Sequence, residues 1–466
     1  MRKTVTLSFI CVFLLLCGSY GCRDNDGIDA KAHKVYGPGE GNTRVRFYNG
    51  LIYTGNTQNP LIAAELWIEG NKIVYAGEGK QNAESFDMEY NLEGNLILPG
   101  FKNAHTHSPM TFLRSLADDM PLDRWLNEQI FPREAKLMPE DVYHLYKLAV
   151  LEYLSGGITA AFDMYFFTAE MGRAAKETGF RAVFCGSVNN IVGSVELLEQ
   201  EFLTLNNYSD RVAFHLGFHA EYTSSDSLLR KVAALSQKYQ APVYFHNSES
   251  ISEVEGCIER HGLTPTAYLE RMGMLDYGGG AFHCVHVTPE DMAIMQRKNI
   301  GVITCPGSNS KLASGIAPIR DMMNAGLLIG AGTDGPASNN ALDMFREMYL
   351  VTAFQRLLLN DAAAMDANDI LTIAVKNSAE IMKLDNCVSL EAGMLADLMV
   401  IDLNQPNMKP TNDIVKNIVY AAGKQNVLMT MVNGRILYEK GKYYVGQPVE
   451  EIYKKAEEII ARIENE

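Results

Sequence analysis

Cysteine is scarce and scattered in this 466-residue chain. Beyond Cys22 the sequence has five cysteines, at positions 185, 257, 284, 305 and 387, and none of them belongs to a Cys-x-x-Cys pair. An odd, unpaired set argues against a disulfide framework and against a zinc site built from thiolates. We therefore expect these cysteines to be buried free thiols.

Positive charge is also in short supply. The chain has 41 Lys and Arg residues against 56 Asp and Glu residues, which gives a formal net charge of -15. A protein with this balance repels the phosphate backbone of nucleic acids, so nucleic acid is not expected as a partner. Hydrophobic residues make up 47% of the chain, which leaves room for one large domain and a smaller one.

The sequence also lacks a hydrophobic run that would make a comfortable transmembrane span. The apolar run near the N-terminus is short, follows a basic start and ends in small residues, which is typical of a secretory signal peptide over residues 1–21. Cys22 and the polar residues after it resemble the lipid-attachment site of bacterial lipoproteins, and residues 22–43 are expected to form a tether. We expect an exported protein that is periplasmic or anchored to a membrane through lipid on Cys22, with a plain secreted protein as the alternative.

Strand-like runs occur in two separate parts of the remaining sequence. Residues 45–98 contain short apolar runs broken by Asn-Gly and Gly-Asn turns, and similar runs return between 396 and 436. Between about 99 and 384, apolar runs of strand length alternate with helical patterns, which indicates repeated βα units and a mostly parallel sheet. Periodicity does not decide between an open sheet and a closed barrel. The residues from 450 onward have the pattern of a charged helix with one apolar face.

Two histidines close the first strand of the alternating region. His105 and His107 are two residues apart, so in a strand both imidazoles point to the same face and can reach one ion. Taken alone, a His-x-His pair is weak evidence for a metal site.

Three later strand ends strengthen this evidence. His246 closes the run 243–246 and is followed at i+3 by Glu249. His283 follows a glycine-rich turn, and Asp334 closes the run 330–334. Residues at the carboxyl ends of different parallel strands converge at the mouth of a barrel. Two or three histidines with an aspartate can hold a zinc-like ion that lowers the pKa of a bound water toward neutrality, so the sequence predicts a hydrolytic metal site.

Several specific phrases resemble the amidohydrolase superfamily. They are residues 103–110 (NAHTHSPM), 162–166 (FDMYF), 311–318 (KLASGIAP) and 332–340 (GTDGPASNN). More narrowly, they resemble the 5′-methylthioadenosine and S-adenosylhomocysteine deaminases, which are relatives of guanine deaminase and the triazine hydrolases. The resemblance covers nearly the whole mature chain. It implies an α/β fold in which a (β/α)8 TIM-type barrel over residues 99–387 is flanked by a β-sandwich made from residues 44–98 and 388–450, followed by a helix over 451–466.

The resemblance also implies roles for the residues at the strand ends. The implied metal ligands are His105, His107, His246 and Asp334, and Asp334 also takes a proton from the bound water. Glu249 matches the acid that moves a proton between the attacking water and the ring nitrogen. His283 matches a histidine that orients and polarises the water.

Three further residues match positions that contact the substrate. Trp125 matches an apolar wall, although an ordinary core tryptophan is nearly as good an interpretation because large aromatics bury area wherever they lie. Glu134 matches a carboxylate on ribose hydroxyls, and His219 matches a substrate-contacting histidine at another strand end.

These matches imply an enzyme that hydrolyses carbon–nitrogen bonds other than peptide bonds. The expected cofactor is one divalent ion per chain, zinc first, with iron or manganese also fitting such ligands. The expected substrate is an aminated purine or related heterocycle, most of all an adenine nucleoside such as 5′-methylthioadenosine, S-adenosylhomocysteine or adenosine. The deaminases of S-adenosylhomocysteine carry arginines that hold the amino-acid carboxylate, and residues 185–194 of this chain contain none, so an uncharged nucleoside is favoured.

Two alternatives stay open. A hydrolase of the same superfamily could open a cyclic amide or remove chloride or an amine from a triazine-like ring. A metal-binding or solute-binding lipoprotein could keep the fold without the reaction, although Glu249 and His283 would then have no purpose. The oligomeric state is not indicated by the sequence.

Overall fold

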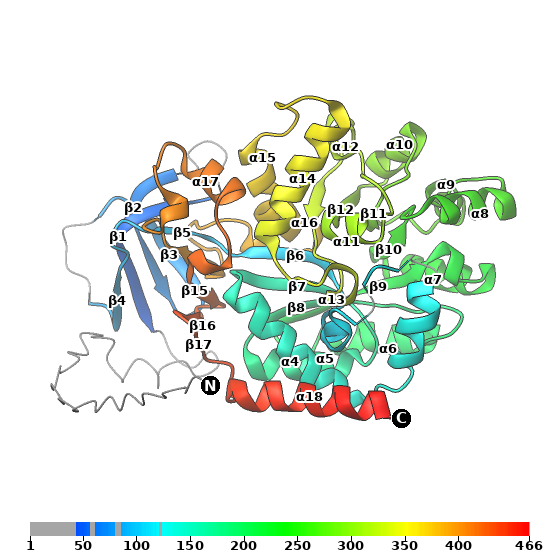
Figure 1. Cartoon of the computed structure of the whole chain (residues 1–466), viewed down its shortest axis with the longest axis horizontal. Coiled ribbons are helices and arrows are strands. Elements are labelled where there is room, and N and C mark those ends of the chain that lie inside the picture. Colours follow the sequence, from blue (N-terminus) through cyan, green and yellow to red (C-terminus); the bar gives the residue numbers. More distant parts are fainter. Residues whose placement is uncertain (1–42, 56–60, 80–84, 117, 121–123, 466) are drawn as a thin grey trace, which may run out of the picture. The chain divides into compact units, whose positions relative to one another are not determined.

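The computed structural model describes residues 43–55, 61–79, 85–116, 118–120 and 124–465 (Figure 1). The predicted signal peptide, Cys22 and nearly all of the predicted tether lie outside the described residues. Among the helices of the described part, none is long and apolar enough to cross a membrane.

Eight strands from the middle of the chain form one parallel sheet in chain order, as the alternating pattern predicts (Figure 1). Each neighbouring pair is parallel, and most of these strands are buried along their whole length, because helices cover the outer face while side chains fill the interior. The strands are β6 (Phe101–Thr106), β7 (Ile158–Met164), β8 (Arg181–Cys185), β9 (Val212–Ala220), β10 (Val243–Asn247), β11 (Gly279–His283), β12 (Ile300–Thr304) and β13 (Ile329–Ala331).

The first and last of these strands meet, which decides the question that the sequence left open. The amide of Asp334 donates to the carbonyl of His105 over 3.0 Å. The side chain of Asn103 accepts from the amide of Thr333 (2.9 Å) and donates to its hydroxyl (2.8 Å). A Cβ on Gly332 would lie 2.6 Å from the backbone nitrogen of His105, so only glycine permits this approach. The seam, defined as these contacts between residues 103–105 and 332–334, closes the sheet, and the predicted (β/α)8 barrel is confirmed.

Helices and turns follow the barrel strands. Several helices begin at a hydroxyl side chain that accepts a backbone N–H of the first turn, such as Ser194, Ser225 and Thr288. The helices of this part are η1 (Ser108–Leu113), η2 (Trp125–Ile130), α3 (Phe131–Glu134), α4 (Pro139–Ser155), α5 (Thr168–Thr178), α6 (Val195–Leu205), η3 (Glu221–Thr223), α7 (Asp226–Tyr239), α8 (Ile251–His261), α9 (Pro265–Arg271), α10 (Pro289–Arg297), α11 (Pro306–Lys311), α12 (Ile319–Asn324), α13 (Pro336–Asn339), α14 (Met344–Leu359), α15 (Ala367–Thr372), η4 (Ile373–Asn377), α16 (Ser378–Ile381) and η5 (Asp385–Cys387).

A second sheet joins the two ends of the described chain. Its path runs β17-β16-β15-β14-β5-β1-β2-β3, with β4 paired to β1. The antiparallel pairing of β5 with β14 links the early strands to the late ones, which confirms a flanking β domain built from both chain ends. The strands are β1 (Arg44–Tyr53), β2 (Leu61–Glu69), β3 (Lys72–Gly77), β4 (Met88–Asn91), β5 (Leu96–Pro99), β14 (Leu398–Ile401), β15 (Val427–Val432), β16 (Arg435–Glu439) and β17 (Lys442–Tyr443); η6 (Pro406–Met408), α17 (Ile414–Tyr420) and η7 (Lys424–Asn426) lie between β14 and β15.

A buried ion pair ties the barrel to this sheet. Arg181, the first residue of β8, donates from Nε to Asp397 over 2.6 Å, and the amide of Asn433 donates to the same carboxylate over 2.7 Å. The Asp397 side chain is fully buried. The contact therefore joins a barrel strand to the loops that precede β14 and β16.

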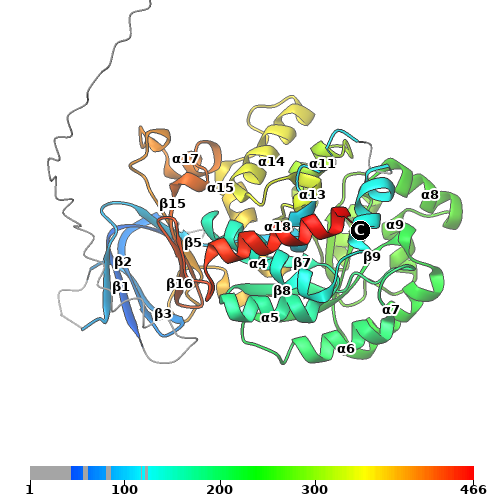
Figure 2. The ribbon, with the colours of Figure 1, turned by 60° about the horizontal axis from the view of Figure 1, so that its bottom comes forward.

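The last helix, α18 (Val449–Asn465), packs along α4 (Figure 2). Its apolar face is buried, and the residues on that face are Ile452, Ala456, Ile459 and Ile463. Lys136 donates to the carbonyl of Ile463 over 2.8 Å, and Arg462 pairs with Asp141 at 2.5 Å. The helix begins two residues before the predicted boundary at 451.

The five cysteines of the described part are all buried and free, as expected. Burial raises the pKa of the thiols of Cys284 and Cys387 to about 12, so both are protonated at neutral pH. They behave as small apolar core residues.

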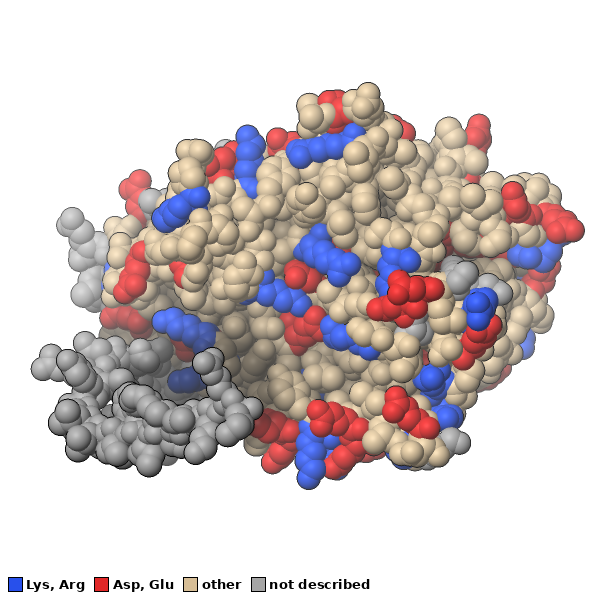
Figure 3. Space-filling view, in the orientation of Figure 1, with Lys and Arg blue, Asp and Glu red and all other residues tan. Residues whose placement is uncertain are grey.

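Figure 3 shows one face of the molecule, on which Lys and Arg side chains lie among Asp and Glu side chains rather than in one continuous area. The excess of acidic residues over basic ones in the sequence makes the net charge negative.

Candidate metal centre and active site

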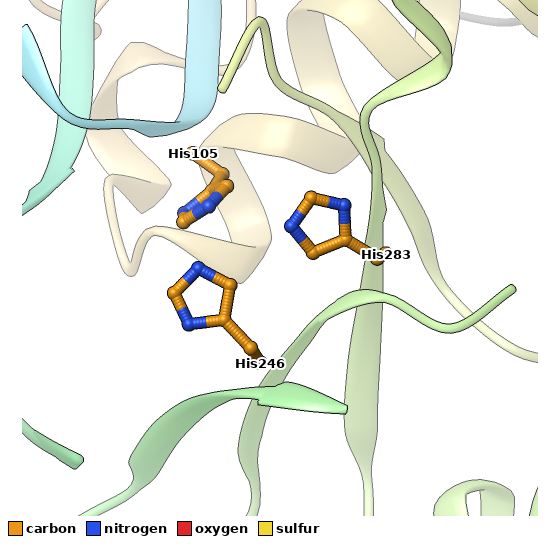
Figure 4. Close-up of side chains that lie close together, drawn as sticks. All are labelled: His105, His246 and His283. Carbon is orange, nitrogen blue, oxygen red and sulfur yellow. The ribbon is translucent and has the colours of Figure 1, made fainter. Parts of the chain in front are cut away.

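Three histidines from three barrel strands converge at the carboxyl ends of those strands (Figure 4). They are His105 on β6, His246 on β10 and His283 at the end of β11. One ring nitrogen from each lies within 4.8 Å of the others. Since these strands are far apart in sequence, only the closed barrel brings their side chains together.

Asp334 completes a second, overlapping group with His105 and His107. Its Oδ1 atom lies 3.5 Å from His105 Nε2 and 3.2 Å from His107 Nε2. His105 lies in β6 and His107 is the residue directly after it, and the rings of both turn toward Asp334, as the i, i+2 spacing predicts.

The donor set fits a divalent ion. Both ring nitrogens of His105 are buried and have no hydrogen-bond partner among the described residues, which would be costly unless they bind something. Burial lowers the pKa of His105 to about 3 and also lowers that of His246, so both rings are neutral, the form that binds metal. Three imidazoles and a carboxylate are a set that divalent transition metals prefer.

The backbone fixes which nitrogen of two of these rings faces the site. His107 Nδ1 lies 2.5 Å from the carbonyl of Met164, and His246 Nδ1 lies 2.8 Å from the carbonyl of His219. Because each Nδ1–H donates to a carbonyl, Nε2 is the nitrogen that faces the ion site. Burial lowers the pKa of His107, but the hydrogen bond to Asp334 raises it to about 9, so an ion would displace a proton from its Nε2.

Asp334 is held in place through its other oxygen. The hydroxyls of Ser308 and Ser338 donate to Oδ2 over 2.6 and 2.7 Å, and the amide of Gly335 donates to Oδ1 over 2.7 Å. Both serine side chains are buried. The carboxylate is therefore fixed with Oδ1 toward the histidines.

Glu249 lies beside the histidine group. Its Oε2 atom is 3.7 Å from His283 Nε2, and the ring of His283 is oriented by Asn309, whose Oδ1 lies 2.8 Å from Nδ1. Burial raises the pKa of Glu249 above its usual value. A raised pKa favours the protonated form, which suits a carboxyl group that has to donate a proton.

The structure places two of the three predicted substrate residues at this site. The ring of His219 lies 4.7 Å from that of His246. Glu134 accepts a 2.6 Å hydrogen bond from the hydroxyl of Tyr165, and burial raises its pKa to about 7. Glu134 also interacts electrostatically with His107. Trp125 begins the π-helix η2 and packs into the main hydrophobic core, so its contact with substrate stays a prediction.

The family follows from sequence and fold together. The model of the amidohydrolase family matches residues 96–437, which is most of the chain. The chain belongs to the amidohydrolase family. A relative in Dictyoglomus thermophilum, a 5-methylthioadenosine/S-adenosylhomocysteine deaminase, is 39% identical over 367 residues, which cover 77% of this chain and 86% of the relative. A relative of the same name in Halothermothrix orenii is 37% identical over 421 residues, covering 88% of this chain and 97% of the relative.

Solved structures share the whole fold of this amidohydrolase. A zinc-bound adenosine deaminase from Xanthomonas campestris superposes with a TM-score of 0.85 at 27% identity, covering 91% of this chain and 99% of that chain. A zinc complex of atrazine chlorohydrolase from Arthrobacter aurescens superposes with a TM-score of 0.82 at 22% identity, covering 89% and 100% of the two chains, which supports the fold alone. The resemblance inferred from the sequence is confirmed, and the zinc-bound adenosine deaminase agrees with the divalent metal that the donor set of this chain fits.

Sequence reasoning missed the residues that orient this site of the amidohydrolase. They are Ser308, Ser338, Asn309, Tyr165 and Glu253, and each contacts a predicted site residue through a hydrogen bond. The signal was available in part, because 308 and 309 follow strand β12 closely and 338 lies in the 332–340 phrase. Nothing in the sequence tells which of several neighbouring polar side chains turns inward.

Proposed function

We propose that this amidohydrolase catalyses the hydrolytic deamination of an adenine nucleoside with one zinc ion per chain. The observation that carries the proposal is the position of the Glu249 carboxyl, 3.7 Å from His283 and beside a group of imidazoles and a carboxylate suited to a divalent ion. A protein that only stores metal has no need of such an acid there. The names of the curated relatives support the same reaction class.

Four residues are suited to hold the ion: His105, His107, His246 and Asp334. When bound, a divalent ion supplies a water of lowered pKa, which is a nucleophile at neutral pH. Asp334, fixed through Oδ2 by two serine hydroxyls, turns Oδ1 toward the histidines, where it would accept a proton from that water. His283, held by Asn309, turns Nε2 toward the same space and orients the water.

Glu249 performs the proton transfers that deamination requires. Addition of water to the amine-bearing carbon places negative charge on the adjacent ring nitrogen, so a proton must be delivered there, and a second must reach the departing amine. Burial raises the pKa of Glu249 above its usual value, which favours the protonated form that a proton donor needs. One carboxyl group can serve both transfers.

The sugar end of the substrate is assigned to Glu134 and His219. Glu134 is oriented by Tyr165 and offers its remaining acceptor sites to ribose hydroxyls. The amide of His219 donates to the carbonyl of Val188 over 3.1 Å, so the 186–194 loop runs beside this end of the site. That loop contains no arginine or lysine to pair with a carboxylate, which favours an uncharged nucleoside over S-adenosylhomocysteine.

Ammonia release from a panel of compounds tests the proposal. The protein without its signal peptide, loaded with zinc, is offered adenosine, 5′-methylthioadenosine, S-adenosylhomocysteine, guanine, cytosine and melamine. We expect release from the uncharged adenine nucleosides first. A metal-loaded protein that is silent on all of them but hydrolyses a cyclic amide or a chlorotriazine would contradict the proposed reaction.

Export is proposed from the sequence alone. A signal peptide over residues 1–21 and lipid on Cys22 would leave the enzyme at a membrane surface, where it would act on nucleosides outside the cytoplasm. Growth with radiolabelled palmitate should label the native protein but not the Cys22→Ala variant. Equal labelling of both, or of neither, would contradict the lipid anchor.

A further inference from the structure

The two backbone amides that flank the Ser248 α-carbon, the second of which is the amide of Glu249, both donate to another carboxylate. Glu253, in the first turn of α8, accepts a hydrogen bond from the amide of Ser248 at Oε1 (2.9 Å) and one from the amide of Glu249 at Oε2 (2.8 Å). The Glu253 residue is only 4% exposed, so water does not compete for either oxygen. Burial raises the pKa of Glu253 to about 7, and the two backbone N–H donors oppose that shift because they favour the ionised form.

The backbone segment that Glu253 holds has an unfavourable conformation at Ser248. Ser248 has φ of +51°, in the left-handed region that residues other than glycine rarely adopt. Its carbonyl accepts from the amide of His286 over 2.9 Å, which ties the loop to the segment after β11. The left-handed turn at Ser248 directs the chain from strand β10 into the site, and it persists only while its surroundings hold it.

Glu253 is itself held rigidly. Its own amide donates to the hydroxyl of Ser250, the residue that caps α8, over 3.2 Å. Cys257, one turn further along the same face of α8, is fully buried, so this face of the helix packs inward. The position of Glu253 is therefore set by a capped helix and not by a flexible loop.

We infer that Glu253 is a positioning residue for the reaction, because its carboxylate fixes the Ser248–Glu249 backbone and thereby aims the Glu249 side chain at the metal site. The inference rests on the proposed proton-transfer role of Glu249. Glu253 acts through the backbone amides of Ser248 and Glu249, which makes it a positioning residue and not a catalytic one. Glu253 determines the position of the Glu249 carboxyl, which is the proton donor. A displacement of about 1 Å in such a group can lower the rate about 100-fold.

Glu253→Gln tests the inference most directly. Glutamine keeps the size and one acceptor oxygen but presents an NH2 group, a donor, to the second backbone N–H. We expect kcat to fall by about 10- to 100-fold with KM for the nucleoside changed less than threefold. Metal content by elemental analysis should equal that of the parent. Glu255→Gln, an exposed residue on the same helix, is the matched control and should leave kcat unchanged.

A double-mutant cycle separates positioning from general damage. If Glu253 acts through Glu249, Glu253→Gln should lower the residual rate of Glu249→Gln by less than threefold, because the aimed group is already gone. A full 10- to 100-fold loss in both backgrounds would overturn the inference. If instead Glu249→Gln alone turned over like the parent, the proton-transfer role would fail, which is a distinct result from failure of Glu253.

Hydrogen exchange provides a measurement that does not depend on turnover. Mass spectrometry of a peptide covering residues 245–252 should show slow exchange at two amides in the parent and fast exchange in Glu253→Gln at unchanged melting temperature. Unchanged protection in the variant would overturn the inference. If Glu253→Gln did not fold, fast exchange of these two amides in the parent protein would itself overturn the inference.

Discussion

At the scale of single residues, the two carboxylate oxygens of Asp334 have different partners. Oδ1 faces the histidines, and Oδ2 accepts from two buried serine hydroxyls. A carboxylate with one oxygen pinned has little freedom to rotate away from the ion or to change from one-oxygen to two-oxygen coordination. The serines therefore set the ligand geometry although neither would contact the metal.

Ser338→Ala should weaken metal binding without unfolding the protein. Loss of one of the two hydroxyls frees Oδ2, and residues that orient metal ligands typically change affinity by about 10- to 100-fold. Competition with a chromophoric chelator measures the dissociation constant. Ser310→Ala is the control, since the hydroxyl of Ser310 is bonded to the carbonyl of Gly307 instead. Equal affinity in both variants would contradict the role of Ser338.

Glu249→Gln and His107→Ala should fail in different ways. The glutamine variant loses the exchangeable proton but no ligand, so we expect full metal content and a fall in kcat of about 100- to 10,000-fold. The alanine variant loses a ligand, so metal and activity should both be lost. Elemental analysis beside a kinetic assay checks both. Normal turnover by Glu249→Gln would remove the acid from the mechanism.

The sequence predicts residues well where the spacing itself carries geometry. The separation of His105 and His107 implies that both side chains lie on one face of a strand. In the structure, Nε2 of each ring lies within 3.5 Å of Asp334 Oδ1. The sequence does not predict the direction of a side chain when that direction depends on the conformation of a turn. Ser308 could not be distinguished from its polar neighbours, because whether a side chain after a strand points inward depends on backbone angles that many sequences share.

At the scale of elements, the seam between β6 and β13 is joined differently from the other strand pairs of the barrel. The side chain of Asn103 takes the place of backbone partners by bonding both the amide and the hydroxyl of Thr333. Periodicity could not distinguish a closed barrel from an open sheet, because the closing contacts leave no mark on the hydrophobic pattern. They are the backbone bond from Asp334 to His105, the bonds of the Asn103 side chain and the close approach at Gly332.

Asn103→Ala should destabilise the barrel locally and reduce metal affinity. The buried amide of Thr333 would lose its acceptor, which costs about 1–3 kcal/mol. Chemical denaturation of the zinc-loaded protein measures the loss. Asn368→Ala, at an exposed position of α15, is a control that should change stability by less than about 0.5 kcal/mol. A variant as stable as this control would show that the Asn103 side chain does not close the seam.

At the scale of the whole molecule, Arg181 and Asp397 hold the barrel and the flanking sheet together through a buried pair. Burial alone would raise the pKa of Asp397, but the neighbouring Arg181 guanidinium brings it below its usual value. The sequence indicated the two halves of the sheet, and only the family resemblance joined them. The paired strands β5 and β14 are separated in sequence by the whole barrel, so no local pattern links them.

Asp397→Asn should be strongly destabilising, by about 3–5 kcal/mol, since it leaves Arg181 charged and unpaired in the interior. The pH dependence follows from the lowered pKa. The stabilisation by Asp397 is complete above its unfolded pKa, near 3.9, and is lost as the pH falls through the lower folded value. The free energy of unfolding of the parent should fall more steeply below pH 4 than that of Asp397→Asn. If the free energy of unfolding fell equally steeply below pH 4 in the parent and in Asp397→Asn, this assignment would be contradicted.

The seam also has a consequence for the order of events during folding. Asn103 and Thr333, which close it, are 230 residues apart in sequence, and the metal ligands beside them are separated almost as widely. The loop-closure entropy for such a contact is not repaid until nearly every βα unit has formed. A divalent ion would therefore be captured only late, by a chain that is already almost folded. Bound between His105 and Asp334, it would join the first and last strands of the barrel and would slow their separation.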